Sequence, residues 1–147
     1  MSSSPVRRSR LRRHAVDARQ TRDGHCRVTV SLEWKEGELF HGSSAGLDTP
    51  EGRVRAGATS TLEAAGGVLT GGLQLELRGI KVVRAFDSQV VLVSLRGRSD
   101  SGQYELIGST TAPDGDLVEG GVLAVLDAIN RILEKYARQE TPPPPPP

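Results

Sequence analysis

The sequence predicts an α+β domain of two pseudo-symmetric β-β-α units, with two helices packed on a mainly antiparallel sheet. Two observations support this fold class: segments with strand and helix periodicity alternate along the chain, and the second half repeats the first. VTVSLEW, LFHGSSAGLD and TLEAAGGVL match VLVSLRG, ELIGSTTAPD and VLDAINRIL in the same order, at an offset between 63 and 66 residues. Because one such unit cannot bury its own apolar face, we expect the two units to pack together.

The first unit opens with two strands. Apolar and polar residues alternate in VTVSLEW (28–34), which is typical of a strand with one buried face. The turn KEGE (35–38) then leads to a second strand in LFHGSSA (39–45). These segments predict a hairpin with one face on the core.

A helix is expected next, in DTPEGRVRAGATSTLEAAGG (48–67). Asp48 or Thr49 can cap its start, and Pro50 suits the first helical position, where the missing N–H costs nothing. Apolar and small residues then recur at helical spacing until a pair of glycines ends the helix.

The second unit contains LQLELRGIKVVRAF (73–86), QVVLVSLRGR (89–98) and QYELIGSTT (103–111), the first being an extra strand region that joins the two units. The second helix follows PDGD, with Asp116 as its cap and Glu119 three residues later, as in a capping box. One apolar stripe runs along this helix, formed by Val118, Val122, Val125, Ile129, Ile132 and Tyr136.

The two ends of the chain differ in composition from its middle. Residues 1–23 hold seven arginines and two aspartates and show no periodicity, so we expect a disordered Arg/Ser-rich leader. Residues 139–147 hold six consecutive prolines and are expected to form a disordered polyproline tail. The folded domain should therefore span residues 24–138.

The composition also limits the compartment and the kinds of site that we expect for this protein. A single cysteine, Cys26, excludes an internal disulfide and a multi-cysteine zinc site, which favours a reducing compartment. The leader has no apolar run of a secretory signal, and no segment is long and apolar enough to span a bilayer. These features predict a cytoplasmic protein with no membrane partner.

The second helix and the strands before it resemble a known family. DLVEGGVLAVLDAIN (116–130), after a Gly-Ser-Thr-Thr turn, is similar to the last helix of the C-terminal regulatory domain of 2-isopropylmalate synthase and of the related homocitrate and citramalate synthases. The matching positions are Asp116, Glu119, Ala124, Leu126, Ala128 and Asn130. LELRGIKVVRAFDSQVVLVSL resembles the strand pair just upstream, and the resemblance spans about residues 28–135. At the first helix, GLDTPEGR keeps only Pro50 of the family's Gly-Asn-Gly-Pro stretch.

The resemblance implies a domain that is not catalytic, pairs with its copy in a second subunit and binds an end-product amino acid. A ligand would then contact the two helix starts, where unpaired N–H groups favour a carboxylate and aspartates can hold an ammonium group. The candidate ligand-binding residues are Asp48, Thr49, Pro50, Asp114, Asp116, Gly120 and Gly121. The aspartates can also serve as helix caps alone. Gly120 and Gly121, which cost a helix about 0.5–1 kcal/mol each relative to alanine, can equally serve tight packing or a dimer contact.

Other kinds of site find less support. His14, His25 and His41 have no metal-ligand spacing, and His25 and Cys26 are neighbours on a strand, whose side chains point to opposite faces. We therefore predict no metal, no cofactor and no catalytic residues. The basic leader offers an alternative, binding to nucleic acid phosphates through Arg7, Arg8, Arg10, Arg12 and Arg13.

The sequence thus predicts a stand-alone, non-enzymatic module that senses a small molecule, such as a branched-chain amino acid, or mediates dimerisation. The expected partners are a second copy, a small-molecule effector and a separately encoded enzyme or other protein. The alternative function is a nucleic-acid-associated protein that uses the basic arm.

Overall fold

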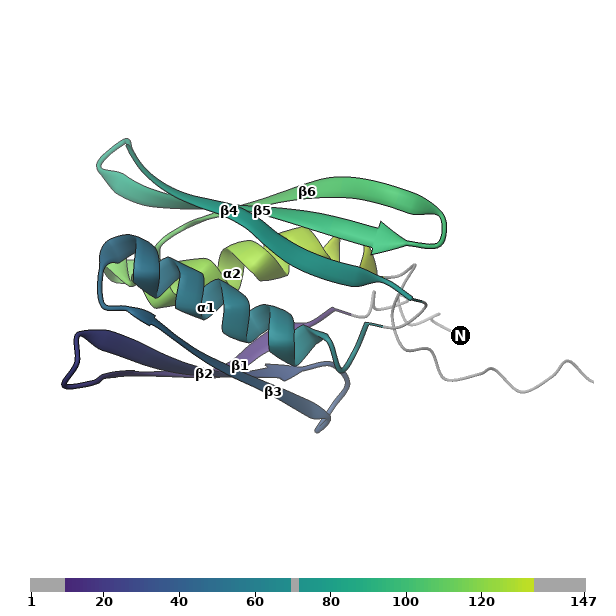
Figure 1. Cartoon of the computed structure of the whole chain (residues 1–147), viewed down its shortest axis with the longest axis horizontal. Helices are drawn as coiled ribbons and strands as arrows, with labels where there is room; N and C mark the ends of the chain where they lie inside the picture. The colour runs from purple at the N-terminus through teal and green to yellow at the C-terminus, as the bar shows by residue number, and fades with distance from the viewer. Residues whose placement is uncertain (1–9, 70–71, 134–147) are drawn as a thin grey trace, which may run out of the picture.

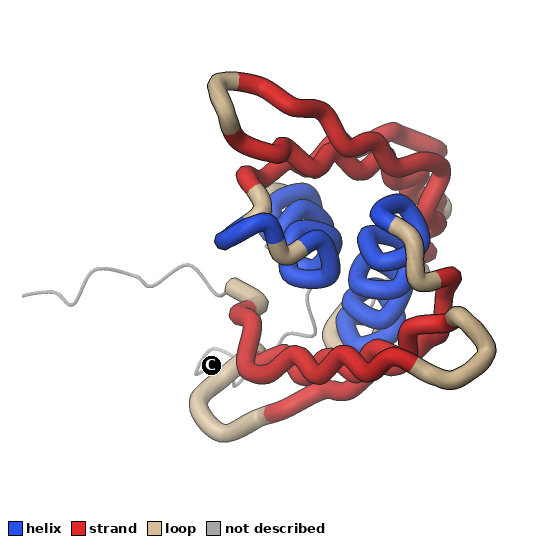
Figure 2. Tube along the Cα trace, turned by 90° about the vertical axis from the view of Figure 1, so that its left-hand side faces the viewer, coloured by secondary structure: helices blue, strands red, loops and turns tan. Residues whose placement is uncertain are grey.

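A computed structural model describes residues 10–69 and 72–133, and places two helices between two three-stranded antiparallel sheets (Figure 1). Viewed along the layers, the helices lie side by side with one sheet above and one below (Figure 2). The elements in chain order are β1 (Arg12–Gln20), β2 (His25–Glu33), β3 (Leu39–Leu47), α1 (Pro50–Ala65), β4 (Gln74–Ala85), β5 (Ser88–Ser99), β6 (Gly102–Thr111), the 3-10 turn η1 (Pro113–Gly115) and α2 (Leu117–Asn130).

The α+β class and the two helices are confirmed, but each unit has one strand more than the sequence indicates. The sheets are β1-β2-β3 and β4-β5-β6, so each unit reads β-β-β-α. The region 73–86 does not join two β-β-α units, because it supplies β4, the first strand of the second unit. Two separate sheets result, one on each side of the helices, in place of the single sheet that we expected.

The counterpart of β4 is β1, which corrects the prediction of a disordered leader over residues 1–23. Residues 12–20 pair with β2, and Val16 lies opposite the fully buried Val30. Each first strand carries a register shift at the equivalent place, between Arg13 and Ala15 in β1 and between Leu77 and Gly79 in β4. The repeat therefore extends into the leader.

The core begins at Leu11, before the expected domain boundary at residue 24. Leu11 is 2% exposed, and its backbone exchanges two hydrogen bonds with one side chain of α2. The Leu11 N–H donates to Asn130 Oδ1 at 2.9 Å, and Asn130 Nδ2 donates to the Leu11 carbonyl at 3.1 Å. This pairing holds the leader against the end of α2, because the amide satisfies both backbone groups of Leu11. Residues 1–9 and the tail, 139–147, lie outside the described residues.

Both predicted helix starts are confirmed. The Thr49 hydroxyl accepts a hydrogen bond from the Gly52 N–H at 3.0 Å, and Pro50 is the first residue of α1. Asp116 caps α2 by accepting from the Glu119 N–H at 3.2 Å. Each cap satisfies one of the N–H groups that a helix leaves unpaired.

The two helices cross at Gly57 and Gly121, which are related by the internal repeat. A Cβ atom added to Gly57 would lie 2.4 Å from the Val118 carbonyl oxygen, and one added to Gly121 would lie 2.3 Å from the Val54 carbonyl oxygen. The contacts are reciprocal, since each glycine of one helix faces the backbone of the other. The missing side chains let the helices approach closely enough for Cα–H groups to face carbonyl oxygens.

The close crossing of α1 and α2 can be tested by measuring the stability of a glycine variant. Gly121→Ala should lower the free energy of unfolding by about 2 kcal/mol, because the clash with a backbone carbonyl outweighs the gain of up to about 1 kcal/mol in helix propensity. Chemical denaturation of both proteins measures this difference. Gly79→Ala is the matched control, since nothing lies within 4 Å of the added Cβ atom. Equal destabilisation by the two substitutions would contradict the close crossing.

Candidate functional site

Asp48, one of the predicted ligand residues, pairs with an arginine of α1. Arg53 Nε donates to Asp48 Oδ1 at 2.6 Å, and Gln20 Nε2 of β1 donates to the other oxygen of Asp48 at 2.8 Å. The hydrogen bond that Arg53 donates to Asp48 is the largest cause that raises the pKa of the guanidinium, and the negative charge of Asp116, at the start of α2, adds a small increase. Asp48 is thus the direct partner of Arg53, and Asp116 adds only a weaker, longer-range attraction.

A second ion pair joins β1 to the first turn of α2. The side chain of Arg13 in β1 donates two hydrogen bonds to Glu119 of α2, one of them from Nε at 2.7 Å. This hydrogen-bonded pairing raises the pKa of Arg13, and Asp116 contributes to the increase. The side chains of Arg13 and Glu119 are 39% and 16% exposed, so the pair borders solvent.

These two ion pairs, together with Asp116, whose charge influences both arginines, are called here the Arg53 cluster: Arg13, Asp48, Arg53, Asp116 and Glu119. Its side chains come from β1, from the segment before α1, from α1 and from the start of α2. Two cations and three anions therefore meet where the first sheet approaches the helix starts. Such a set can bind a zwitterion, with a guanidinium for a carboxylate and a carboxylate for an ammonium group.

Cys26 lies close to the charged groups of this cluster. Its thiol is 2% exposed, and burial raises its pKa. Asp48 and Asp116 raise the pKa further, whereas Arg53 opposes them. The balance favours the neutral thiol, because apolar surroundings penalise the thiolate.

The remaining predicted ligand residues lie at the margins of this cluster or are buried. Thr49, Pro50 and Asp114 are exposed, and Asp114 has a left-handed backbone conformation (φ 50°) in the 3-10 turn before α2. Gly120 and Gly121 are buried, and the space above them is filled by this chain's own atoms. A Cβ atom at Gly120 would lie 2.7 Å from Val91 Cγ2 in β5. Both glycines therefore serve packing and offer no open surface to a ligand.

The arginines of the leader divide into different environments. Arg7 and Arg8 lie outside the described residues, whereas Arg10 and Arg12 are exposed. Arg13 pairs with Glu119 and is not part of a free basic arm. The role of these arginines in binding nucleic acid stays a prediction.

Sequence reasoning identified the two helix caps but missed the residues that surround them. Arg53 appears in the sequence as one of several arginines of an amphipathic helix, and Arg13 as part of a charged run. A capping aspartate three to five residues before an arginine is a weak local signal for the Asp48–Arg53 pair. The Arg13–Glu119 pair has no local signal, because its partners are 106 positions apart.

Two kinds of feature are absent from residues 10–69 and 72–133. Within these ranges, no three His, Cys, Asp or Glu side chains gather in a way that could hold a metal ion. Within the same ranges, neither helix has the length and apolar character needed to cross a membrane.

The burial of Cys26 predicts slow modification of its thiol. In the native chain at pH 7.5, a thiol reagent should react with Cys26 at least about a hundredfold more slowly than in denaturant, because reaction requires local opening and the raised pKa lowers the thiolate fraction. Absorbance detection of the released thiolate measures both rates. Equal rates in native and denaturing buffer would contradict the burial of this side chain.

No model of a known protein family matches this sequence, and no curated protein matches it. The resemblance to the regulatory domain of 2-isopropylmalate synthase therefore stays a prediction from the residues. A functional proposal for this protein therefore rests on the contacts and charges of the Arg53 cluster.

Proposed function

We propose that this protein is a non-enzymatic module that senses a small zwitterion, such as a branched-chain amino acid, at the Arg53 cluster. One observation carries the proposal: the partly exposed Arg53 donates to Asp48, which also accepts from Gln20 of β1, so a cation and an anion lie side by side at the start of α1. An α-amino acid presents both charges that such a set recognises.

The arrangement also suggests how ligand binding would be communicated to another protein. A ligand carboxylate that pairs with Arg53 competes with Asp48, and Asp48 is held by Gln20 of β1. A ligand ammonium group that pairs with Asp116 or Glu119 competes with Arg13, also in β1. Binding would therefore change the contacts between β1 and the helix starts, which a separately encoded enzyme or other protein could detect.

The reducing cytoplasm is the compartment that suits this module. Its single cysteine is a buried, free thiol, and nothing in the described fold depends on a disulfide. The alternative of a nucleic-acid-associated protein draws support from Arg10 and Arg12, but the pairing of Arg13 with Glu119 weakens it.

The proposal predicts ligand-dependent stabilisation of the full chain. Thermal unfolding should be screened against the twenty amino acids, branched 2-oxo acids and malate-like diacids. A ligand at about 100 times its Kd adds about 2.7 kcal/mol, which raises the Tm by roughly 10 °C. An amino acid that gives such a shift is the expected result, and no shift with any compound at millimolar concentration would contradict the proposal.

Two variants assign the shift to the cluster. Arg53→Met should remove the shift because it keeps the side-chain stem but loses the cation, whereas Arg55→Met, at an exposed position on the same helix, should retain it. Asp116→Ser keeps a good helix cap but removes the negative charge. It should weaken binding with little change in the Tm of the unliganded chain. Retention of the full shift in Arg53→Met would place the ligand elsewhere.

A further inference from the structure

The two sheets present chemically different outer faces, although the repeat gives them the same register. Val30 pairs with Gly42 in the first sheet, as Val93 pairs with Gly108 in the second, and all four lie on the core side. Side chains alternate along a strand, so the intervening residues face outward. The outward residues Val83, Val90, Leu92 and Ile107 of the second sheet correspond to Arg19, Arg27, Thr29 and His41 of the first.

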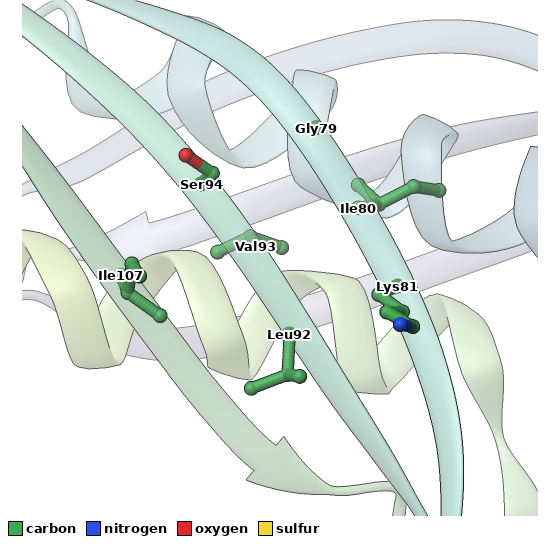
Figure 3. A pocket seen from close by; sticks show the side chains of 7 residues that line it. All are labelled: Gly79, Ile80, Lys81, Leu92, Val93, Ser94 and Ile107. Carbon is green, nitrogen blue, oxygen red and sulfur yellow. The ribbon is translucent and has the colours of Figure 1, made fainter.

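The outer face of the second sheet contains a hollow with a volume of about 260 Å³, lined by residues of all three strands. Figure 3 shows Lys81 of β4, Leu92 of β5 and Ile107 of β6 on the outer side of the sheet, with the helices behind it. Ile107 is 61% exposed. A cavity of about 150 Å³ can hold benzene, so the hollow has room for a phenyl ring.

The same sheet carries an exposed phenylalanine at the turn between β4 and β5. Ala85 pairs with Ser88, so Phe86 and Asp87 form a two-residue turn, and both have positive φ angles of 51° and 64°. Turns of this kind prefer Asn-Gly, because bulky side chains are strained at positive φ. Phe86 is 100% exposed, and Figure 1 shows the turn standing clear of the helices. Nothing in this chain's own core explains a phenylalanine here.

We propose that the outer face of the β4-β5-β6 sheet binds a second copy of this chain, with Phe86 of each copy seated in the hollow of the other. The charges beside these two features are complementary, since Asp87 adjoins Phe86 and Lys81 borders the hollow. Among residues 10–69 and 72–133, neither Lys81 nor Asp87 makes an ion pair. A contact between copies gives each of these charges a partner.

Two-fold symmetry allows both insertions at once. Phe86 and the segment Gly79–Lys81 lie five to seven positions apart along the chain, which is roughly 17–23 Å at about 3.3 Å per residue. An axis that crosses the strands midway between them brings each Phe86 over the hollow of the other copy. The result is a closed dimer, in which the same surface of both copies is used.

The oligomeric state of the full chain tests this proposal. Sedimentation equilibrium should show a dimer for the natural sequence. Phe86→Gly should weaken the dimer at least tenfold, with an unchanged or raised Tm of the monomer, because glycine adopts positive φ without strain. A monomeric natural chain, or a Phe86→Gly variant that dimerises as tightly as the natural chain, would overturn the proposal.

Matched variants separate the two sheets. Ile107→Asn should weaken the dimer at least tenfold, whereas Leu47→Asn, at a residue with 59% exposure on the first sheet, should leave it unchanged. Lys81→Glu and Asp87→Lys should each weaken the dimer, and the double variant should recover most of the loss because the charges are exchanged. A double variant no tighter than the weaker single variant would contradict the pairing of Asp87 with Lys81. The surface is separate from the Arg53 cluster, so the ligand screen and this experiment can fail independently.

Discussion

The close crossing of α1 and α2 is the contact on which the rest of this fold depends. Gly57 and Gly121 each face the backbone of the opposite helix, and this brings the two β-β-β-α halves into one core. Two further glycines allow a similarly close approach between the helices and the sheets. A Cβ atom on Gly42 of β3 would meet the Ser60 carbonyl oxygen of α1, and one on Gly108 of β6 would meet the Ala124 carbonyl oxygen of α2. Close backbone approach, rather than large side chains, sets the spacing of the layers.

This packing decides which surfaces remain for binding. The helices lie between the sheets, so much of their surface is already used within the chain. Polar chemistry is left where the helix starts reach β1, at Arg13, Arg53 and Asp116. Apolar binding surface is left on the outside of the second sheet, around Leu92 and Ile107. The internal repeat gives both halves of the chain the same β-β-β-α scaffold. The proposed ligand site and the proposed dimer surface both depend on residues in which the two halves differ.

Local sequence patterns were enough to predict the fold class, both helix caps, and the strands β2, β3, β5 and β6. Strand alternation and helix capping depend on residues that are close together in the sequence. Local patterns failed for β1, whose sequence RRHAVDARQ contributes few apolar side chains, such as Val16, to the core. Its pairing depends on β2 and on Asn130, which are distant in sequence. The Arg53 cluster was half predicted for the same reason: Asp48 and Asp116 lie at helix starts that are visible in the sequence, whereas Arg13 meets Glu119 only through the fold.

The most direct test of the helix crossing is proton–proton contact measured by solution NMR. The account predicts cross-peaks between an α-proton of Gly57 and the α-proton of Val118, and between an α-proton of Gly121 and the amide proton of Ala58, since the corresponding heavy atoms approach closely. Both cross-peaks should appear together, because the repeat makes the contacts reciprocal. Their joint absence from an otherwise assigned, folded chain would contradict the packing of the two halves through these glycines.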